Sequence, residues 1–100
     1  MTWTTVHELG DLPSNVPVAV DGDAICLIRT NGEVYAVRNE CTHGAVPLSE
    51  GEVDGFTLEC FMHGSRFDVR TGTALNLPAT RPVTTYPVRV VDGQIQVLRA

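Results

Sequence analysis

The stretch CTHGAVPLSEGEVDGFTLECFMHG, residues 41–64, contains two cysteines and two histidines in two short groups. The first group is Cys41-x-His43 and the second is Cys60-x-x-His63, and a glycine follows each histidine directly. Thiolates and imidazoles are strong ligands for transition metals, and two such pairs are hard to explain as ordinary core or surface residues. Sixteen residues separate His43 from Cys60, which is enough chain for two loops joined by a hairpin. The segment therefore predicts a metal site built from two loops.

Two metal chemistries fit this set of ligands. Two cysteines and two histidines can form the tetrahedral site of a structural zinc ion. Zinc sites, however, usually group their cysteines in one knuckle and their histidines in the other, whereas here each group is mixed. The mixed order suits a dinuclear iron centre, because each loop can place its cysteine on one iron and its histidine on the other. The order of the residues favours iron, and zinc remains the alternative.

Length and composition indicate one soluble globular domain. The chain has 100 residues, of which 43% are hydrophobic and 19% are charged. The first residues form neither a basic nor an apolar run, and no stretch reaches the roughly 18–20 apolar residues of a spanning helix. We therefore expect a cytoplasmic protein with no membrane association. The net charge of −5 argues against a nucleic-acid partner, since such partners require cationic surfaces, and it fits a partner with a basic docking face.

The remaining candidate ligands have simpler interpretations. The chain has three cysteines, an odd and low number that does not predict a disulfide framework. Cys26 lies within the alternating segment AICLIR and is expected to be a packed core thiol. His7 is far from the two groups in sequence and is expected to be an ordinary edge-strand residue.

Short runs rich in Val, Ile, Tyr and Thr predict an all-β fold. Asn31-Gly32 and Asp92-Gly93 are preferred hairpin dipeptides, and Asp54-Gly55 predicts a hairpin within residues 53–60. No segment has a sustained helical period, so no long helix is expected. Strands this short and evenly spaced indicate a sandwich or a small barrel. The predicted strands are residues 3–7, 17–20, 24–30, 33–38, 57–60, 66–69, 86–91 and 94–99.

One segment does not fit a strand. Residues 75–87, LNLPATRPVTTYP, contain three prolines, and proline cannot donate to a central β-ladder. We expect a stiff surface loop here.

The two groups resemble the cluster-binding boxes of the Rieske family, in which C-x-H and C-x-x-H are separated by about sixteen residues. The segments that match these boxes are CTHG and CFMHGSRFDVRTG. The downstream segment LPATRPV is similar to the proline-containing loop that covers the cluster in that family. The similarity spans nearly the whole chain. Chain size and boxes together resemble the small Rieske ferredoxins of bacterial ring-hydroxylating dioxygenase systems.

The resemblance implies a fold, a cofactor and a ligand set. The fold would be a Rieske-type antiparallel β-sandwich in one domain, residues 1–100. A cluster-binding subdomain would be inserted at about residues 40–70, with the covering loop at about 75–87. The cofactor would be one [2Fe–2S] cluster, with Cys41 and Cys60 on one iron and His43 and His63 on the other.

The resemblance also implies a role. The protein would not be an enzyme itself but would carry single electrons from an NAD(P)H-dependent flavoprotein reductase to a terminal oxygenase. No residues suggest a mononuclear iron site, because His7 is the one histidine outside the boxes. The alternative is a cluster protein associated with iron–sulfur assembly or redox regulation.

Departures from the respiratory members of the family predict a low reduction potential. Those proteins have an extra cysteine in each box, whereas the corresponding positions here are Val46 and Met62, so the same disulfide cannot form. They also have a tyrosine that donates to a ligand sulfur where this chain has Phe67. Losing a donor lowers the potential, although the Ser65 hydroxyl could still reach a bridging sulfide. We expect the lower part of the Rieske range, which spans roughly −150 to +300 mV.

Residues next to the four ligand candidates are expected to have supporting roles. Gly44 and Gly64 would let backbone amides approach the cluster sulfurs, because no Cβ intrudes. Phe61 and Met62 are expected to shield the edge of the cluster from water.

Overall fold

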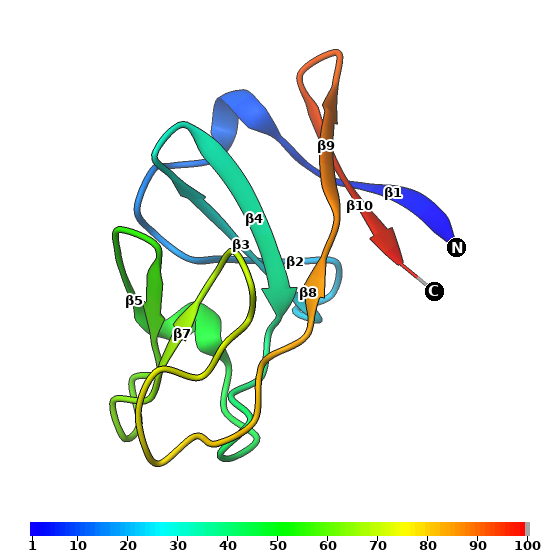
Figure 1. Ribbon diagram of the computed structural model, residues 1–100. Helices are drawn as coiled ribbons and strands as arrows, with labels where there is room; N and C mark the ends of the chain where they lie inside the picture. The colour runs from blue at the N-terminus through cyan, green and yellow to red at the C-terminus, as the bar shows by residue number, and fades with distance from the viewer. Residues whose placement is uncertain (100) are drawn as a thin grey trace.

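The strands assemble into three antiparallel sheets over the described part of the chain (Figure 1). The structure is a computed structural model that describes residues 1–99. The terminal sheet has the order β1-β10-β9, formed by Thr2–Glu8, Gln94–Arg99 and Val88–Val91. The central sheet has the order β2-β3-β4-β8, formed by Val18–Val20, Ile25–Thr30, Glu33–Arg38 and Thr85–Tyr86. The small sheet has the order β5-β6-β7, formed by Glu52–Asp54, Thr57–Glu59 and Arg66–Asp68.

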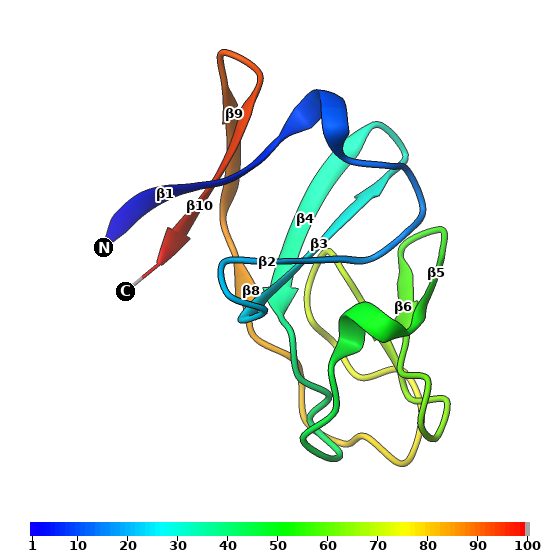
Figure 2. The same cartoon turned by 180° about the vertical axis from the view of Figure 1, so that it is seen from behind.

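Helical structure in residues 1–99 is limited to single turns. They are the 3₁₀ turns η1, Leu9–Asp11, and η2, Leu48–Glu50, the second of which is prominent in Figure 2. In the same residues no helix is long and apolar enough to cross a membrane. The all-β prediction is confirmed.

The predicted hairpins form at their dipeptides. Asn31 and Gly32 have φ values of 52° and 77°, and Thr30 pairs with Glu33 across the β3–β4 turn. Asp92 and Gly93 have φ values of 51° and 76° between β9 and β10. Positive φ at both central residues is typical of a type I′ turn, whose twist matches that of the strands. The expected hairpin at Asp54-Gly55 also forms, as β5 and β6.

Strand β3 contributes side chains to two separate hydrophobic cores. Its alternate side chains point to opposite faces, as in any strand. Ile25 and Leu27 pack into a core between the central and terminal sheets, together with Ile95 and Val97. Cys26 and Ile28 pack on the other face, into a core shared with the small sheet and both box cysteines. The central sheet is therefore the middle layer of the sandwich.

The prediction for Cys26 is confirmed. Its side chain is fully buried, and this burial raises the pKa of the thiol to about 12. His7 lies on β1, an edge strand of the terminal sheet, as expected.

The prediction of one strand over residues 86–91 is wrong. The segment breaks at Pro87 into β8, which pairs with β4, and β9, which pairs with β10. Proline has no N–H for a ladder, so the chain can leave the central sheet here and enter the terminal sheet. The carbonyl of Pro87 still accepts a hydrogen bond from the Leu98 N–H at 3.0 Å.

The prediction of a surface loop over residues 75–87 is partly wrong. Ala79 and Val83 are buried, with 3% exposure each, and they pack into the core that holds the box cysteines. Prolines stiffen the segment, but its small apolar side chains fill the core instead of facing solvent.

Gly72 joins this segment to the end of the small sheet. Its φ is +82°, its carbonyl accepts a hydrogen bond from the Val83 N–H at 2.9 Å, and an added Cβ would lie 2.2 Å from the Val83 oxygen. We expect Gly72→Ala to lower the free energy of unfolding by about 3 kcal/mol, because a positive φ and a backbone clash add together.

Urea unfolding followed by circular dichroism measures this effect. Gly22→Ala is the matched control, because Gly22 has a φ of +66° but no atom within 4 Å of the added Cβ. The control should lose only about 1 kcal/mol. Equal losses in the two variants would contradict the close approach at Gly72.

Candidate metal centre

The first box is held in a tight turn after β4. The backbone N–H of Cys41 donates to the Val46 carbonyl at 2.9 Å, and the Val46 N–H donates to Gly44 at 2.8 Å. These bonds close the box-1 loop, residues 41–47, and leave His43 exposed at its tip. Gly44 has no atom within 4 Å of an added Cβ, so the described residues do not themselves require glycine there.

The second box forms the connection between β6 and β7. The Cys60 N–H donates to the Ser65 carbonyl at 2.7 Å, and the Gly64 N–H donates to the Cys60 carbonyl at 3.1 Å. Gly64 has a φ of +74°, a conformation that favours glycine, and this turns the chain back into β7. These bonds close the box-2 loop, residues 60–65, with His63 exposed.

The folded chain brings the two box cysteines together. Cys41 and Cys60 are each 2% exposed and belong to one core cluster. Burial raises the pKa of Cys41, and the neighbouring Cys60 raises it too, whereas backbone N–H groups of His43 and Gly44 lower it. A metal that binds here must displace the thiol protons, so loading depends on pH.

The two histidines also meet, but at the surface. The ring centroids of His43 and His63 lie 4.9 Å apart, and the ring planes are inclined by 81°. The structure thus sorts the ligand candidates into a buried thiol pair and an exposed imidazole pair. Each pair takes one member from each loop.

This sorting fits a dinuclear centre better than a mononuclear one. Within residues 1–99, no three Cys, His, Asp or Glu side chains gather around one point as a single metal ion would require. A structural zinc ion needs four converging ligands. A Rieske-type cluster needs only two protein ligands on each iron, because sulfides complete the coordination. The donor set present here therefore fits the cluster.

Phe67 and Ser65 pack beneath the site from β7 and its preceding loop. Both side chains are fully buried, and Phe67 belongs to the core cluster of the two cysteines. The Ser65 Oγ accepts a hydrogen bond from the Ala79 N–H at 3.0 Å, so the hydroxyl proton is left for another acceptor. Its donation to a sulfide stays a prediction.

Phe61 and Met62 are more exposed than shielding residues would be. Their side chains are 49% and 52% exposed, and the neighbouring Leu77 is 74% exposed. Phe61 and Met62 directly precede His63, and Leu77 follows Asn76, whose side chain donates to the Gly64 carbonyl of the box-2 loop. These three residues are here called the apolar rim. Their role as a shield stays a prediction.

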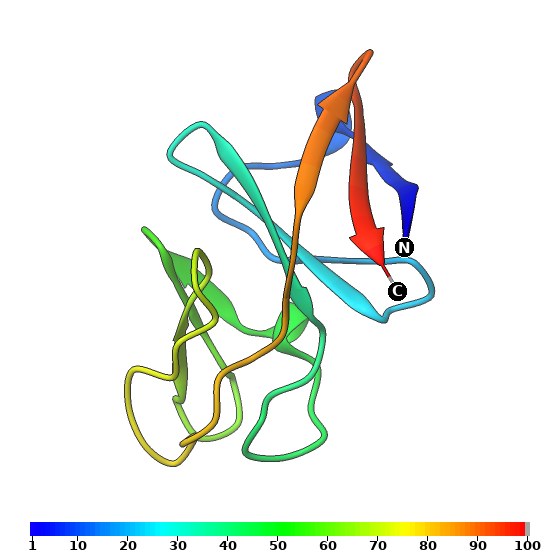
Figure 3. The ribbon, with the colours of Figure 1, turned by 45° about the vertical axis from the view of Figure 1, so that its right-hand side comes forward.

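Sequence reasoning missed the roles of three polar residues, which are Thr42 within the first box and Asn76 and Arg81 in the segment that follows Ala74. The side chains of Thr42, Asn76 and Arg81 form hydrogen bonds between the box loops and the segment that follows Ala74. The motif LPATRPV marked this segment as a loop but gave no sign of which side chains anchor it. Three loops thus meet at one end of the molecule, opposite the β9–β10 turn (Figure 3).

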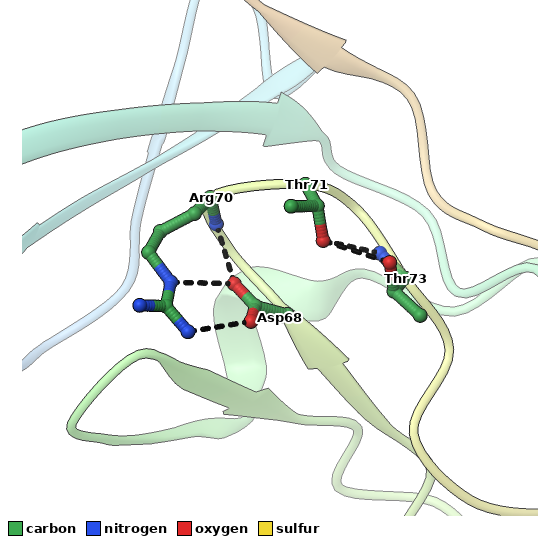
Figure 4. A network of polar contacts seen from close by, with 4 residues as sticks. All are labelled: Asp68, Arg70, Thr71 and Thr73. Carbon is green, nitrogen blue, oxygen red and sulfur yellow. Dashed lines mark hydrogen bonds and ion pairs between the residues drawn. The ribbon is translucent and has the colours of Figure 1, made fainter.

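A second polar network forms in the turn of residues 68–73, which follows β7 (Figure 4). Arg70 donates to both carboxylate oxygens of Asp68, at 3.1 and 2.9 Å, and its backbone N–H donates to the same carboxylate. The Arg70 guanidinium also lies 4.0 Å from the centre of the Phe56 ring, which meets Tyr35 of β4 edge to face. The network thus connects the small sheet to the central sheet.

This network predicts a pH-dependent contribution to stability. The hydrogen bonds from Arg70 lower the pKa of Asp68 below its ordinary value of 3.8. A folded-state pKa below the unfolded one adds stability above pH 3.8, and that stability is lost as the pH falls through the folded-state pKa. Asp68→Asn should therefore be less stable than wild type at pH 7, and the gap should narrow at pH 3, which lies below the ordinary pKa of 3.8. Urea unfolding midpoints at both pH values test this, and an unchanged gap would contradict it.

Comparisons with known proteins agree with the geometry. A family model described as Rieske [2Fe-2S] domain matches residues 2–87. The chain is 42% identical over 95 residues to the ferredoxin component of the naphthalene 1,2-dioxygenase/salicylate 5-hydroxylase systems of Ralstonia sp, covering 93% of this chain and 91% of that protein. The ferredoxin of Sphingomonas yanoikuyae B1 superposes with a TM-score of 0.92 at 32% identity, covering 99% of this chain and 100% of that one.

A third similarity involves a complex. A chain in the complex of reduced oxygenase and oxidized ferredoxin of carbazole 1,9a-dioxygenase superposes with a TM-score of 0.85 at 35% identity. The match covers 95% of this chain and 91% of that chain. Family model, sequence relatives and solved structures all cover nearly the whole chain, and the protein belongs to the Rieske [2Fe–2S] domain family.

Proposed function

We propose that this protein is a ferredoxin that carries single electrons from an NAD(P)H-dependent flavoprotein reductase to a terminal ring-hydroxylating oxygenase. The observation that carries the proposal is the pairing of buried thiols beneath exposed imidazoles at one end of the molecule. When bound, a Rieske cluster supplies a centre that accepts and releases one electron. The chain acts as a carrier and not as the catalytic subunit.

In this proposal Cys41 and Cys60 hold one iron, and His43 and His63 hold the other. The box loops would be the tip of a cluster-binding subdomain at about residues 40–70, covered by the loop at about 75–87, within one domain of residues 1–100. The burial of the two thiols, at 2% exposure each, keeps water from that side of the site. The exposed rings give an electron a short path to a partner that touches the tip.

The similarity to dioxygenase ferredoxins supports the choice of partners. One relative is named as the ferredoxin component of dioxygenase and hydroxylase systems, and one solved neighbour is a complex of an oxygenase with its ferredoxin. The apolar rim of Phe61, Met62 and Leu77 offers an oxygenase a desolvated contact beside the histidines. The net charge of −5 favours partners with a basic docking face and not nucleic acid.

The cytoplasm is the compartment that suits this role. A reductase that uses NAD(P)H works where that coenzyme is kept. The three cysteines, at positions 26, 41 and 60, are free in the structure, as expected of a protein in a reducing compartment.

Reconstitution tests the function. The holoprotein is mixed with NADH and with the reductase and oxygenase of a ring-hydroxylating dioxygenase system, and the hydroxylated product is measured with and without the ferredoxin. We expect product formation to require the holoprotein. Reduction and reoxidation without any oxygenase turnover would overturn the proposal and leave a role in cluster assembly or redox regulation.

A variant of the apolar rim tests the docking face in the same assay. Leu77→Ser removes an exposed apolar side chain without touching a ligand, and we expect the KM for the ferredoxin to rise about fivefold to tenfold. Val90→Ser is the matched control, because Val90 is 45% exposed on β9, far from the tip (Figure 1). Equal KM values for the two variants would contradict docking at the rim.

A further inference from the structure

The segment of residues 75–83, here called the strap, crosses the end of the molecule where both box loops lie. Its N-terminal part holds the box-2 side through Asn76. The Asn76 Nδ2 donates to the Gly64 carbonyl at 3.1 Å, and its Oδ1 accepts from the Arg66 N–H at 2.6 Å. The Ala79 N–H donates to the Ser65 Oγ at 3.0 Å. One amide side chain and one backbone group thus fasten the strap to the turn that carries His63.

The C-terminal part of the strap holds the box-1 loop through a reciprocal pair of bonds. The Thr42 Oγ1 donates to the Arg81 carbonyl at 2.8 Å, and the Arg81 Nη2 donates to the Thr42 carbonyl at 3.1 Å. Thr42 stands between Cys41 and His43. A shift of the strap at Arg81 would therefore move both box-1 ligand candidates.

The strap supplies the hydrogen bonds that connect the two loops. Among the described residues, no hydrogen bond joins the box-1 loop directly to the box-2 loop. The free cysteines and the side chains at Val46 and Met62 provide no covalent link between the loops either.

We propose that Asn76, Arg81 and Thr42 are positioning residues that fix the two iron-binding loops at their working separation. The inference rests on the ligand set proposed above. The hydrogen bonds of these side chains hold the two box loops at a fixed separation, and this separation sets the distance between the His43 and His63 rings. The same bonds would determine how firmly the two rings hold an iron. Supporting groups of this kind typically change metal affinity by about 10–100-fold when they are removed.

The charge of Arg81 offers a competing explanation that can be separated from the hydrogen bond. Arg81 lines a groove of about 380 Å³ beside His43, and the same groove is lined by Arg38 and Glu40. Arg38 carries the same charge and forms an ion pair with Glu40 at 3.7 Å, but it makes no bond to the box loops in the described residues. Arg38→Ala therefore removes a nearby charge without releasing the strap.

Iron release and EPR of the holoprotein test the proposal. The rate of iron transfer to a chelator and the g-values and line widths of the dithionite-reduced protein are measured for Asn76→Ala and Arg81→Ala. We expect each variant to release iron about tenfold faster, because one or two hydrogen bonds are lost. We also expect broadened or shifted g features. The controls Arg38→Ala and Thr80→Ala, a change at an exposed strap residue, should match wild type.

Each outcome decides the question. Wild-type release rates and spectra in both strap variants would overturn the proposal, and equal effects in Arg38→Ala would assign the effect to charge. If Asn76→Ala does not take up iron, Asn76→Asp is used, because it keeps an acceptor for the Arg66 N–H and loses the donor to Gly64. Thr42→Val, compared with Thr42→Ser, tests the other end. If the wild-type protein lacked a Rieske EPR signal, the result would overturn the proposed ligand set and not the role of the strap.

Discussion

Replacing His63 with alanine is expected to abolish stable cluster binding. The variant leaves one iron with His43 as its single protein ligand and opens a coordination position at the surface, where water can enter and iron can escape. Loss of a mere supporting group costs about 10–100-fold in metal affinity, and loss of a ligand should cost at least as much. We expect the purified variant to contain less than about a tenth of the wild-type iron. Metal and acid-labile sulfide analysis, with the visible spectrum, measures this.

His7→Ala is the matched control for this change. His7 is the one histidine outside the boxes and lies on β1, in the terminal sheet. Its Nδ1 contacts the neighbouring Glu8 carbonyl at 2.8 Å and no box residue. The control should retain full iron and sulfide content. A full Rieske spectrum in His63→Ala would show that the ligand assignment is wrong.

Replacing Phe67 with alanine is expected to give the largest loss of folding stability. Phe67 is fully buried in the middle of β7, where it pairs with Leu58 of the neighbouring strand β6, and it shares a core cluster with Cys41 and Cys60. Truncation of a buried phenylalanine removes apolar contact and leaves a cavity, which costs about 3–5 kcal/mol. Urea unfolding gives the free-energy change, and the rate of iron loss should rise in parallel because the cavity lies beside both thiols.

Phe67→Leu separates volume from the particular shape of the ring. Leucine fills most of the cavity and should cost less than about 1.5 kcal/mol if volume dominates. A loss below about 1 kcal/mol in Phe67→Ala would contradict the central place of this ring in the core, because fully buried aromatic residues rarely tolerate truncation.

Strands were predicted correctly from the sequence where they are joined by short turns, because the residues that determine such a turn are adjacent in the chain. Asn31-Gly32 and Asp92-Gly93 define their hairpins because both residues of each turn can adopt a positive φ. The change of sheet at Pro87 was not predicted, because residues on both sides have strand-like composition and the partner strands are distant in sequence. The burial of Ala79 and Val83 was missed for the same reason, since it depends on a core assembled from far along the chain.

For the site, the spacing of the cysteines and histidines predicted the metal centre. Nothing in the sequence predicted which side chains anchor the loops around it. The order Cys-x-His and Cys-x-x-His predicted two loops that share a metal centre, and the structure brings the cysteines together in the core and the histidines together at the surface. Asn76 and Arg81 could not be recognised, because a polar residue in a proline-rich loop has no periodicity to mark its contacts. Their hydrogen bonds exist only after the strap has crossed both loops.

The central claim is that one cluster with mixed ligands lies between the two box loops. The most direct measurement is the EPR spectrum of the dithionite-reduced protein, taken on a sample whose iron and acid-labile sulfide have been counted. The account predicts about two irons and two sulfides per chain and the signal of one iron ligated by histidine and one by cysteine. Zinc without sulfide, or the signal of an all-cysteine cluster, would contradict it.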